Sequence, residues 1–119
     1  MTGKVGEDLA VTYLKKNGYQ IVERNYHQKC GEIDIIAWEK KTLVFVEVKT
    51  RKSKTFGSPF DAITTKKQQQ IARTAQDYLC RKKLFNKPAR FDVIGITLPA
   101  NSQPIIEMIH NAFDLPDTH

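Results

Sequence analysis

Three charged side chains stand inside two stretches that otherwise have the apolar composition of buried strands. Asp34 interrupts the apolar run at 33–37, and Glu47 and Lys49 interrupt the run at 44–49. Because alternate residues of a strand point to the same face, Glu47 and Lys49 are expected to address one site. A two-residue turn between the strands would also set Asp34 opposite Glu47, with their Cβ atoms about 5 Å apart.

This predicted pair of acids calls for a cation. Two carboxylates held so close, in a partly buried setting, repel each other and cost free energy unless a cation lies between them. Mg²⁺ or Mn²⁺ would be held by oxygen atoms of Asp34, Glu47 and the backbone carbonyl of Val48. Lys49 would orient or help to deprotonate a metal-bound water, or stabilise the charge that develops on a phosphate. These are the requirements of phosphodiester hydrolysis.

The prediction of a metal site depends on the register of the hairpin. A two-residue turn at 40–41 sets Asp34 opposite Glu47. The same turn sets Glu32 opposite Lys49. A register shifted by one residue would place Asp34 on the face away from Glu47, which leaves Glu47 and Lys49 as an ordinary surface pair on an edge strand. The sequence keeps both interpretations open.

A third acid is expected on the inward face of the first helix. Projected at 100° per residue, Glu7 falls between Val11 and Leu14, inside the apolar arc. The carboxylate either offsets the dipole at the helix N-terminus or lends its charge to the predicted site. A metal site beneath the helix favours the second interpretation.

Several cations stand where they could contact a nucleic-acid backbone. Arg51, Lys52 and Lys54 belong to a loop predicted at 51–61, where each neutralised phosphate would strengthen binding in a salt-dependent way. Lys67 is predicted on the inward face of the second helix, near its positive N-terminal end, which suits a phosphate contact. A solvated lysine at a helix end and a solvated loop are the alternatives.

Other conspicuous residues are given structural roles. Phe56 and Phe60 are expected to anchor their loop to the core, although they could stack on bases. Arg90 and Asp92 lie two apart at the start of a strand and are predicted to form an internal ion pair. The three histidines have no partner at ligand spacing, so no catalytic role is given to His27, His110 and His119.

Hydrophobic spacing and glycine and proline punctuation predict the elements that must hold these residues. Helices are expected at 5–17 and 65–84, and strands at 19–26, 31–38, 42–50, 91–98 and, as an edge, 105–109. The helix between the third and fourth strands predicts that these strands are parallel neighbours. The third strand is apolar enough to be central. The expected fold is α/β, one domain over 1–119, with a mixed sheet flanked by helices in the order αβββαβ(β).

Composition limits the classes of function. The chain has 119 residues, and no apolar run approaches the roughly 20 residues that span a bilayer, so no membrane partner is expected. The net charge of +6 favours a polyanionic partner, with nucleic acid the leading candidate. The first residues lack the apolar segment of a secretory signal, which predicts a cytoplasmic protein. Cys30 and Cys80 are interpreted as free thiols.

The pattern of Asp34 followed on the next strand by Glu47-Val48-Lys49 resembles the PD-(D/E)XK motif of the restriction endonuclease-like superfamily. The chain from Gly3 to about Phe113 is more closely similar to the YraN family of bacterial proteins, and the motifs that carry this resemblance are Gly6-Glu7, Gly31-Glu32-Ile33-Asp34, Phe45-Val46-Glu47-Val48-Lys49-Thr50-Arg51, Phe56-Gly57, Lys67 and Arg90-Phe91-Asp92-Val93.

This resemblance implies a fold like that of the archaeal Holliday junction resolvases. It also implies that Asp34 and Glu47 are metal ligands, that Lys49 is the catalytic lysine and that Glu7 is the helix-borne acid. One position departs from the literal motif, because Ile33 stands where the superfamily name has proline.

The expected function is therefore that of a metal-dependent nuclease that hydrolyses phosphodiester bonds in DNA, with branched or damaged DNA as candidate substrates. One alternative is a noncatalytic nucleic-acid-binding module with a nuclease-like fold. Another is a protein-interaction domain in which the basic loop is incidental. A homodimer stays open, because resolving a junction usually demands two sites.

Overall fold

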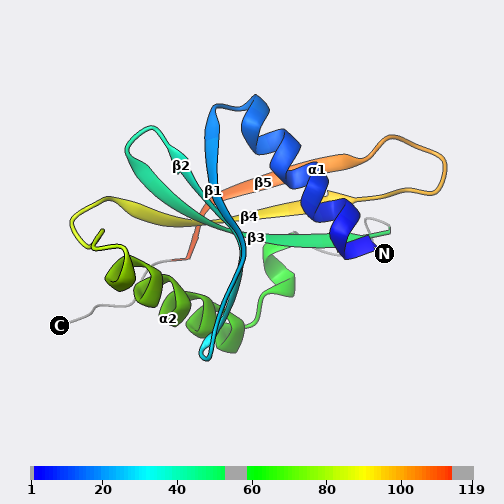
Figure 1. The fold of residues 1–119 in the computed structure, drawn as a ribbon. Coiled ribbons are helices and arrows are strands. Elements are labelled where there is room, and N and C mark those ends of the chain that lie inside the picture. The colour runs from blue at the N-terminus through cyan, green and yellow to red at the C-terminus, as the bar shows by residue number, and fades with distance from the viewer. Residues whose placement is uncertain (1, 53–58, 114–119) are drawn as a thin grey trace.

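The computed structural model describes residues 2–52 and 59–113. Five strands form one sheet, and two α-helices and a short 3₁₀-helix pack against it (Figure 1). Along the chain the elements are α1 (Thr2–Lys16), β1 (Tyr19–Gln28), β2 (Gly31–Glu39), β3 (Thr42–Arg51), η1 (Pro59–Ala62), α2 (Thr65–Arg81), β4 (Ala89–Thr97) and β5 (Ile105–Phe113). The predicted class, a mixed α/β fold, is confirmed.

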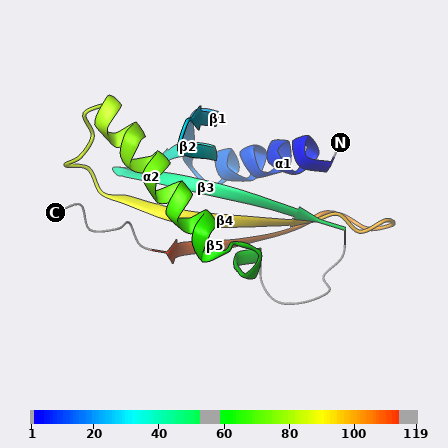
Figure 2. The same cartoon turned by 90° about the horizontal axis from the view of Figure 1, so that it is seen from below.

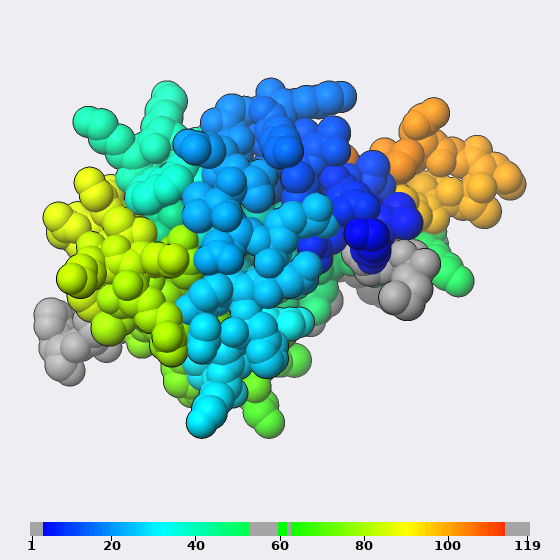
Figure 3. Space-filling model, in the orientation of Figure 1, coloured from blue at the N-terminus to red at the C-terminus, as the bar shows by residue number. Residues whose placement is uncertain are grey.

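The sheet has the order β1-β2-β3-β4-β5, so β3 is central, as its apolar composition predicts. β3 and β4 run parallel because α2 returns the chain to the edge where β3 began, and the other neighbours are antiparallel. In the space-filling view β1 lies on the surface between α1 and α2 (Figure 3). No helix in the described ranges is long and apolar enough to cross a membrane.

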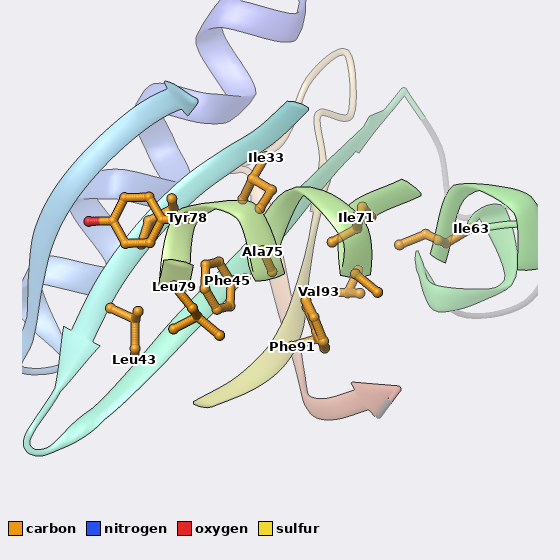
Figure 4. Packing of buried hydrophobic residues seen from close by; sticks show 12 residues of the cluster. Ile33, Leu43, Phe45, Ile63, Ile71, Ala75, Tyr78, Leu79, Phe91 and Val93 are labelled. Carbon is orange, nitrogen blue, oxygen red and sulfur yellow. The ribbon is translucent and has the colours of Figure 1, made fainter. Parts of the chain in front are cut away.

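The two helices cover opposite faces of the sheet (Figure 2). On one face, Ala10 and Leu14 of α1 pack on apolar side chains that include Val44 and Val46 of β3. On the other, the predicted stripe of α2 is buried, and Figure 4 shows it against Phe45, Phe91 and Val93; its members are Ile71, Ala75, Tyr78 and Leu79. Phe60 of η1 packs against this second cluster, as expected, whereas Phe56 lies outside the described residues.

Several predicted boundaries are wrong by a few residues. β3 continues to Arg51, because its parallel ladder with β4 runs on to the pair Arg51 and Thr97. α2 ends at Arg81 rather than 84, because the backbone N–H of Lys82 turns back to earlier carbonyls and Lys83 adopts a left-handed φ of 57°. The edge strand is longer than expected and reaches Phe113.

The turn between β2 and β3 is the predicted two-residue loop. Glu39 pairs with Thr42, and Lys40 has a φ of 54°, as the tight turns that suit twisted hairpins require. The register then runs without a shift to the pair Ile35 and Val46. The hairpin therefore has the register on which the predicted acidic pair depends.

Candidate functional site

Asp34 and Glu47 meet where the β2–β3 ladder ends. The backbone pairing stops at Ile35 and Val46, and just beyond it the Asp34 and Glu47 carboxyl groups lie within hydrogen-bonding reach of each other. There the Asp34 side chain replaces the missing backbone partner, because its Oδ2 atom accepts a hydrogen bond of 2.8 Å from the Val48 N–H. The described ladder does not extend to the predicted pair of Glu32 and Lys49.

Glu47 is a buried acid whose charge is poorly compensated. Its relative exposure is only 6%. Burial, together with hydrogen bonding to Asp34 and repulsion from that carboxylate, raises the pKa of Glu47 to about 8, although the charges of Lys67 and Lys49 oppose the shift. At neutral pH, Glu47 is therefore largely protonated beside Asp34. A divalent cation, which attracts the carboxylate more strongly than Lys67 and Lys49 do, would displace that proton.

Lys67 reaches Glu47 from the first turn of α2. Thr64 caps this helix, and its Oγ1 accepts a hydrogen bond of 3.1 Å from the Lys67 N–H. The Lys67 ammonium then lies 3.6 Å from Glu47 Oε2. The predicted inward position of Lys67 at the helix N-terminus is therefore confirmed, and its described partner is a carboxylate.

Lys49 lies on the same strand as Glu47, two residues further on, and is half-buried. Alternation along β3 puts both side chains on the α2 face, together with the buried Phe45. Lys49 is close enough for its charge to lower the pKa of Glu47. The predicted shared orientation of the two residues therefore agrees with their electrostatic contact.

Glu7 contacts β1 rather than the acids of the site. Its Oε1 accepts hydrogen bonds of 3.0 Å from Arg24 and 3.1 Å from Asn25. In the β1–β2 pairing Arg24 is opposite Ile35 and Tyr26 is opposite Ile33, and Asn25, with a left-handed φ of 54°, lies between them. Glu7 therefore binds β1 on the α1 side of the sheet, and Arg24 neutralises its charge.

A close helix–strand contact fixes the height of Glu7 over the sheet. The neighbouring Gly6 is buried against Thr50 of β3, and a Cβ atom at Gly6 would overlap the Thr50 hydroxyl. Only glycine permits this approach. The close packing of Gly6 thus fixes the position of the neighbouring Glu7 carboxylate.

The cations of the predicted basic loop do not all belong to a loop. Arg51 belongs to β3, and its guanidinium donates to Thr97 Oγ1 at 3.3 Å and pairs with Glu107 at 3.2 Å, which ties three strands together. Lys52 is exposed directly after the strand. Lys54 lies outside the described residues.

The donor set at this site fits a hard cation. Two carboxylates converge there, and the Val48 N–H points toward Asp34. The Val48 N–H points toward β2, and because the N–H and C=O of one strand residue point to the same side of the strand, the Val48 carbonyl is expected on that side too. Three oxygen-bearing groups suit Mg²⁺, which keeps its remaining ligands as water. Within 2–52 and 59–113, no three side chains of Asp, Glu, His or Cys gather as a metal-binding group, here or at any other place, so the third oxygen at this site would have to come from the backbone.

A second polar cluster was missed because its members are far apart in the sequence. The predicted pair of Arg90 and Asp92 is confirmed, with the guanidinium Nε at 3.1 Å from both carboxylate oxygens. Asp92 also lies 3.0 Å from His110 Nδ1, a partner that no short spacing could indicate. Arg90 further donates to Glu39 at 2.7 Å and to Tyr19 at 2.8 Å. A small hollow of about 110 Å³ lies beside this cluster, between α1 and β5.

Comparison with known proteins places the chain in a bacterial family. The model of the uncharacterised protein family UPF0102 matches residues 6–96. A UPF0102 protein of Geotalea daltonii is 55% identical over 95% of this chain and 89% of its own length. UPF0102 proteins of Geobacter sulfurreducens and Clostridium botulinum are each 50% identical over 95% of this chain, and over 88% and 94% of their own lengths. The chain therefore belongs to the UPF0102 family.

Proposed function

We propose that this protein is a metal-dependent nuclease of the restriction endonuclease-like type, which hydrolyses phosphodiester bonds in DNA. The observation that carries the proposal is the buried Glu47 held against Asp34, with a pKa raised to about 8. A fold that buries two acids together, at a cost in free energy, has a use for the cation that would relieve their repulsion.

Each residue of the site has a role in this proposal. Asp34, Glu47 and the Val48 carbonyl hold Mg²⁺ or Mn²⁺. The ion, when bound, supplies Lewis-acid chemistry and makes water a better nucleophile near neutral pH. Lys49, on the same face as Glu47, orients the attacking water or stabilises negative charge on the phosphate. The Asp34 carboxylate is held in place by the Val48 N–H.

A polyanionic substrate suits the charges around the site. The net charge is +6, and the exposed Lys52 follows the strand that carries Glu47 and Lys49. Lys67 stands at the positive N-terminal end of α2, where a phosphate group would also be favoured. We propose DNA as the substrate, with branched DNA to be tested first, and a homodimer as the form that would cut two strands.

Glu7 has a supporting role in the same proposal. Its hydrogen bonds to Arg24 and Asn25 hold β1 against α1 beside the site. The carboxylate thus positions the part of β1 that pairs with β2 on either side of Asp34, while Arg24 neutralises its charge.

The direct test is cleavage of labelled four-way, single-stranded and linear DNA in Mg²⁺ or Mn²⁺. Asp34→Asn and Glu47→Gln should each lower the cleavage rate by roughly a hundredfold or more, since both remove a charged ligand. Glu32→Gln, the same chemical change at an exposed position of β2, should cut like the wild type. DNA binding without cutting under either metal would instead support the noncatalytic module.

A further inference from the structure

The ion pair between Lys67 and Glu47 is long, and one of its partners is partly exposed to solvent. Its N–O distance of 3.6 Å is longer than the roughly 2.7–2.9 Å of a strong charge-assisted hydrogen bond. The Lys67 side chain keeps 32% of its surface exposed, whereas Glu47 keeps only 6%. The acid is therefore fixed inside the protein, and its partner lies at the boundary with solvent.

The backbone of Lys67 is held although its side chain is not. Thr64 accepts the Lys67 N–H through its side chain, and its carbonyl accepts the Gln68 N–H. A lysine carries its charge on a flexible four-carbon stem, so the ammonium can leave Glu47 without any change in α2. With its Cα atom fixed, Lys67 can thus place its ammonium group either against Glu47 or away from it.

The ammonium and a metal ion compete for the same acid. A divalent cation bound between Asp34 and Glu47 would share the Glu47 carboxylate with Lys67 and would repel its positive charge. Binding of the ion and departure of the lysine are therefore linked. A lysine driven from Glu47 remains at the helix N-terminus, at the mouth of the site, where phosphate is favoured.

We propose that Lys67 is a displaceable internal cation, which lies against the Glu47 carboxyl group before the metal binds and then moves to a phosphate of the DNA. This inference rests on the proposed nuclease function. Because linked binding is reciprocal, a phosphate that draws Lys67 away also strengthens metal binding, so metal and DNA favour each other through one side chain. A lysine that served only as a phosphate contact would leave metal affinity in the absence of DNA unchanged.

The test measures Mg²⁺ affinity calorimetrically without DNA, at pH 9, where proton competition at Glu47 is small. Lys67→Met should bind Mg²⁺ about tenfold more tightly than the wild type, within the range of typical couplings. Lys66→Met removes the same charge from the neighbouring exposed position and should change the affinity less than about twofold. Lys67→Gln, which also removes the charge, should behave like Lys67→Met.

A second readout follows Lys67 itself. In the wild type, Mg²⁺ should shift the NMR signal of the Lys67 side-chain Cε group and leave that of Lys66 in place. Unchanged or weaker Mg²⁺ binding by both Lys67 variants, with normal binding by the wild type, would overturn this inference alone. A wild type that binds Mg²⁺ no better than Glu47→Gln would overturn the metal site and the inference together.

Discussion

Two buried acids, Glu47 and Asp92, lie one register step apart on adjacent strands and face opposite sides of the sheet. Asp92 pairs with Val46 in the parallel ladder, and Glu47 pairs with Val93. Asp92 receives Arg90 on both oxygens, the N–H of Asn111 and the His110 ring. Glu47 has a lysine at 3.6 Å and a second acid as neighbour.

This difference separates a structural acid from a candidate functional one. A buried charge is tolerated when hydrogen bonds and a counter-charge satisfy it, and this is the situation of Asp92. For Glu47 the fold supplies less compensation than burial requires, so its pKa rises. The protein's own groups thus compensate the charge of Asp92, whereas the charge of Glu47 would need an added cation.

The largest effect should come from breaking the cluster around Asp92. Asp92→Ala removes the fully buried carboxylate on which Arg90 and the Asn111 N–H converge, and should lower the free energy of unfolding by about 3–5 kcal/mol. Denaturant unfolding measures this loss. His110→Ala is the control, because His110 is 54% exposed at its side chain and its loss should cost far less. A loss below about 1 kcal/mol for Asp92→Ala would contradict a structural role.

For the other cluster, formed by Glu47, Asp34 and Lys67, we expect the stability of the fold to depend on pH. The folded protein holds a proton on Glu47 up to a pKa of about 8, whereas the ordinary value is 4.5, so the folded state binds more protons between these limits. Stability without metal should therefore fall as the pH rises from about 4.5 to about 8. The slope from this group approaches 1.4 kcal/mol per pH unit, and the total amounts to a few kcal/mol.

Glu47→Gln isolates this contribution, since glutamine fills the same space and does not titrate. With a chelator present to remove metal ions, denaturant unfolding should show that the variant is more stable than the wild type at pH 9. At pH 5 the two proteins should be nearly equally stable. An equal pH dependence in the two proteins would mean that Glu47 carries no raised pKa in solution.

The smallest effect concerns the helix end that brings Lys67 to the site. Thr64→Ala removes the cap of α2 and should lower stability by about 1 kcal/mol. Thr65→Ala, at the exposed first residue of the same helix, is the control and should be nearly neutral. A neutral Thr64→Ala would show that the cap does not hold the first turn in place.

Local patterns in the sequence predicted the parts of the site that depend on local rules. The stripe of α2 follows from helical spacing, and this spacing also turns Lys67 inward. The two-residue turn fixed the register of the β2–β3 hairpin, which brings Asp34 toward Glu47. Short-range geometry was sufficient for these features.

Features that depend on distant pairing could not be predicted in this way. His110 meets Asp92 only because β5 pairs with β4 across an irregular register near Asn111, which has a left-handed φ of 52°. Arg51 has a charged, loop-like neighbourhood in the sequence but continues β3, because the parallel partner strand extends beside it. The partner of Glu7, Arg24, likewise comes from another element.

The most direct test of the central claim is the pKa of Glu47, measured by carboxyl NMR with and without Mg²⁺. Without metal the pKa should be about 8, as burial beside Asp34 requires. Mg²⁺ should lower the apparent pKa strongly, because the ion competes with the proton for the same oxygen atoms. A pKa that stays the same at saturating Mg²⁺, or lies near 4.5 in its absence, would contradict the claim that Glu47 is kept for a metal ion.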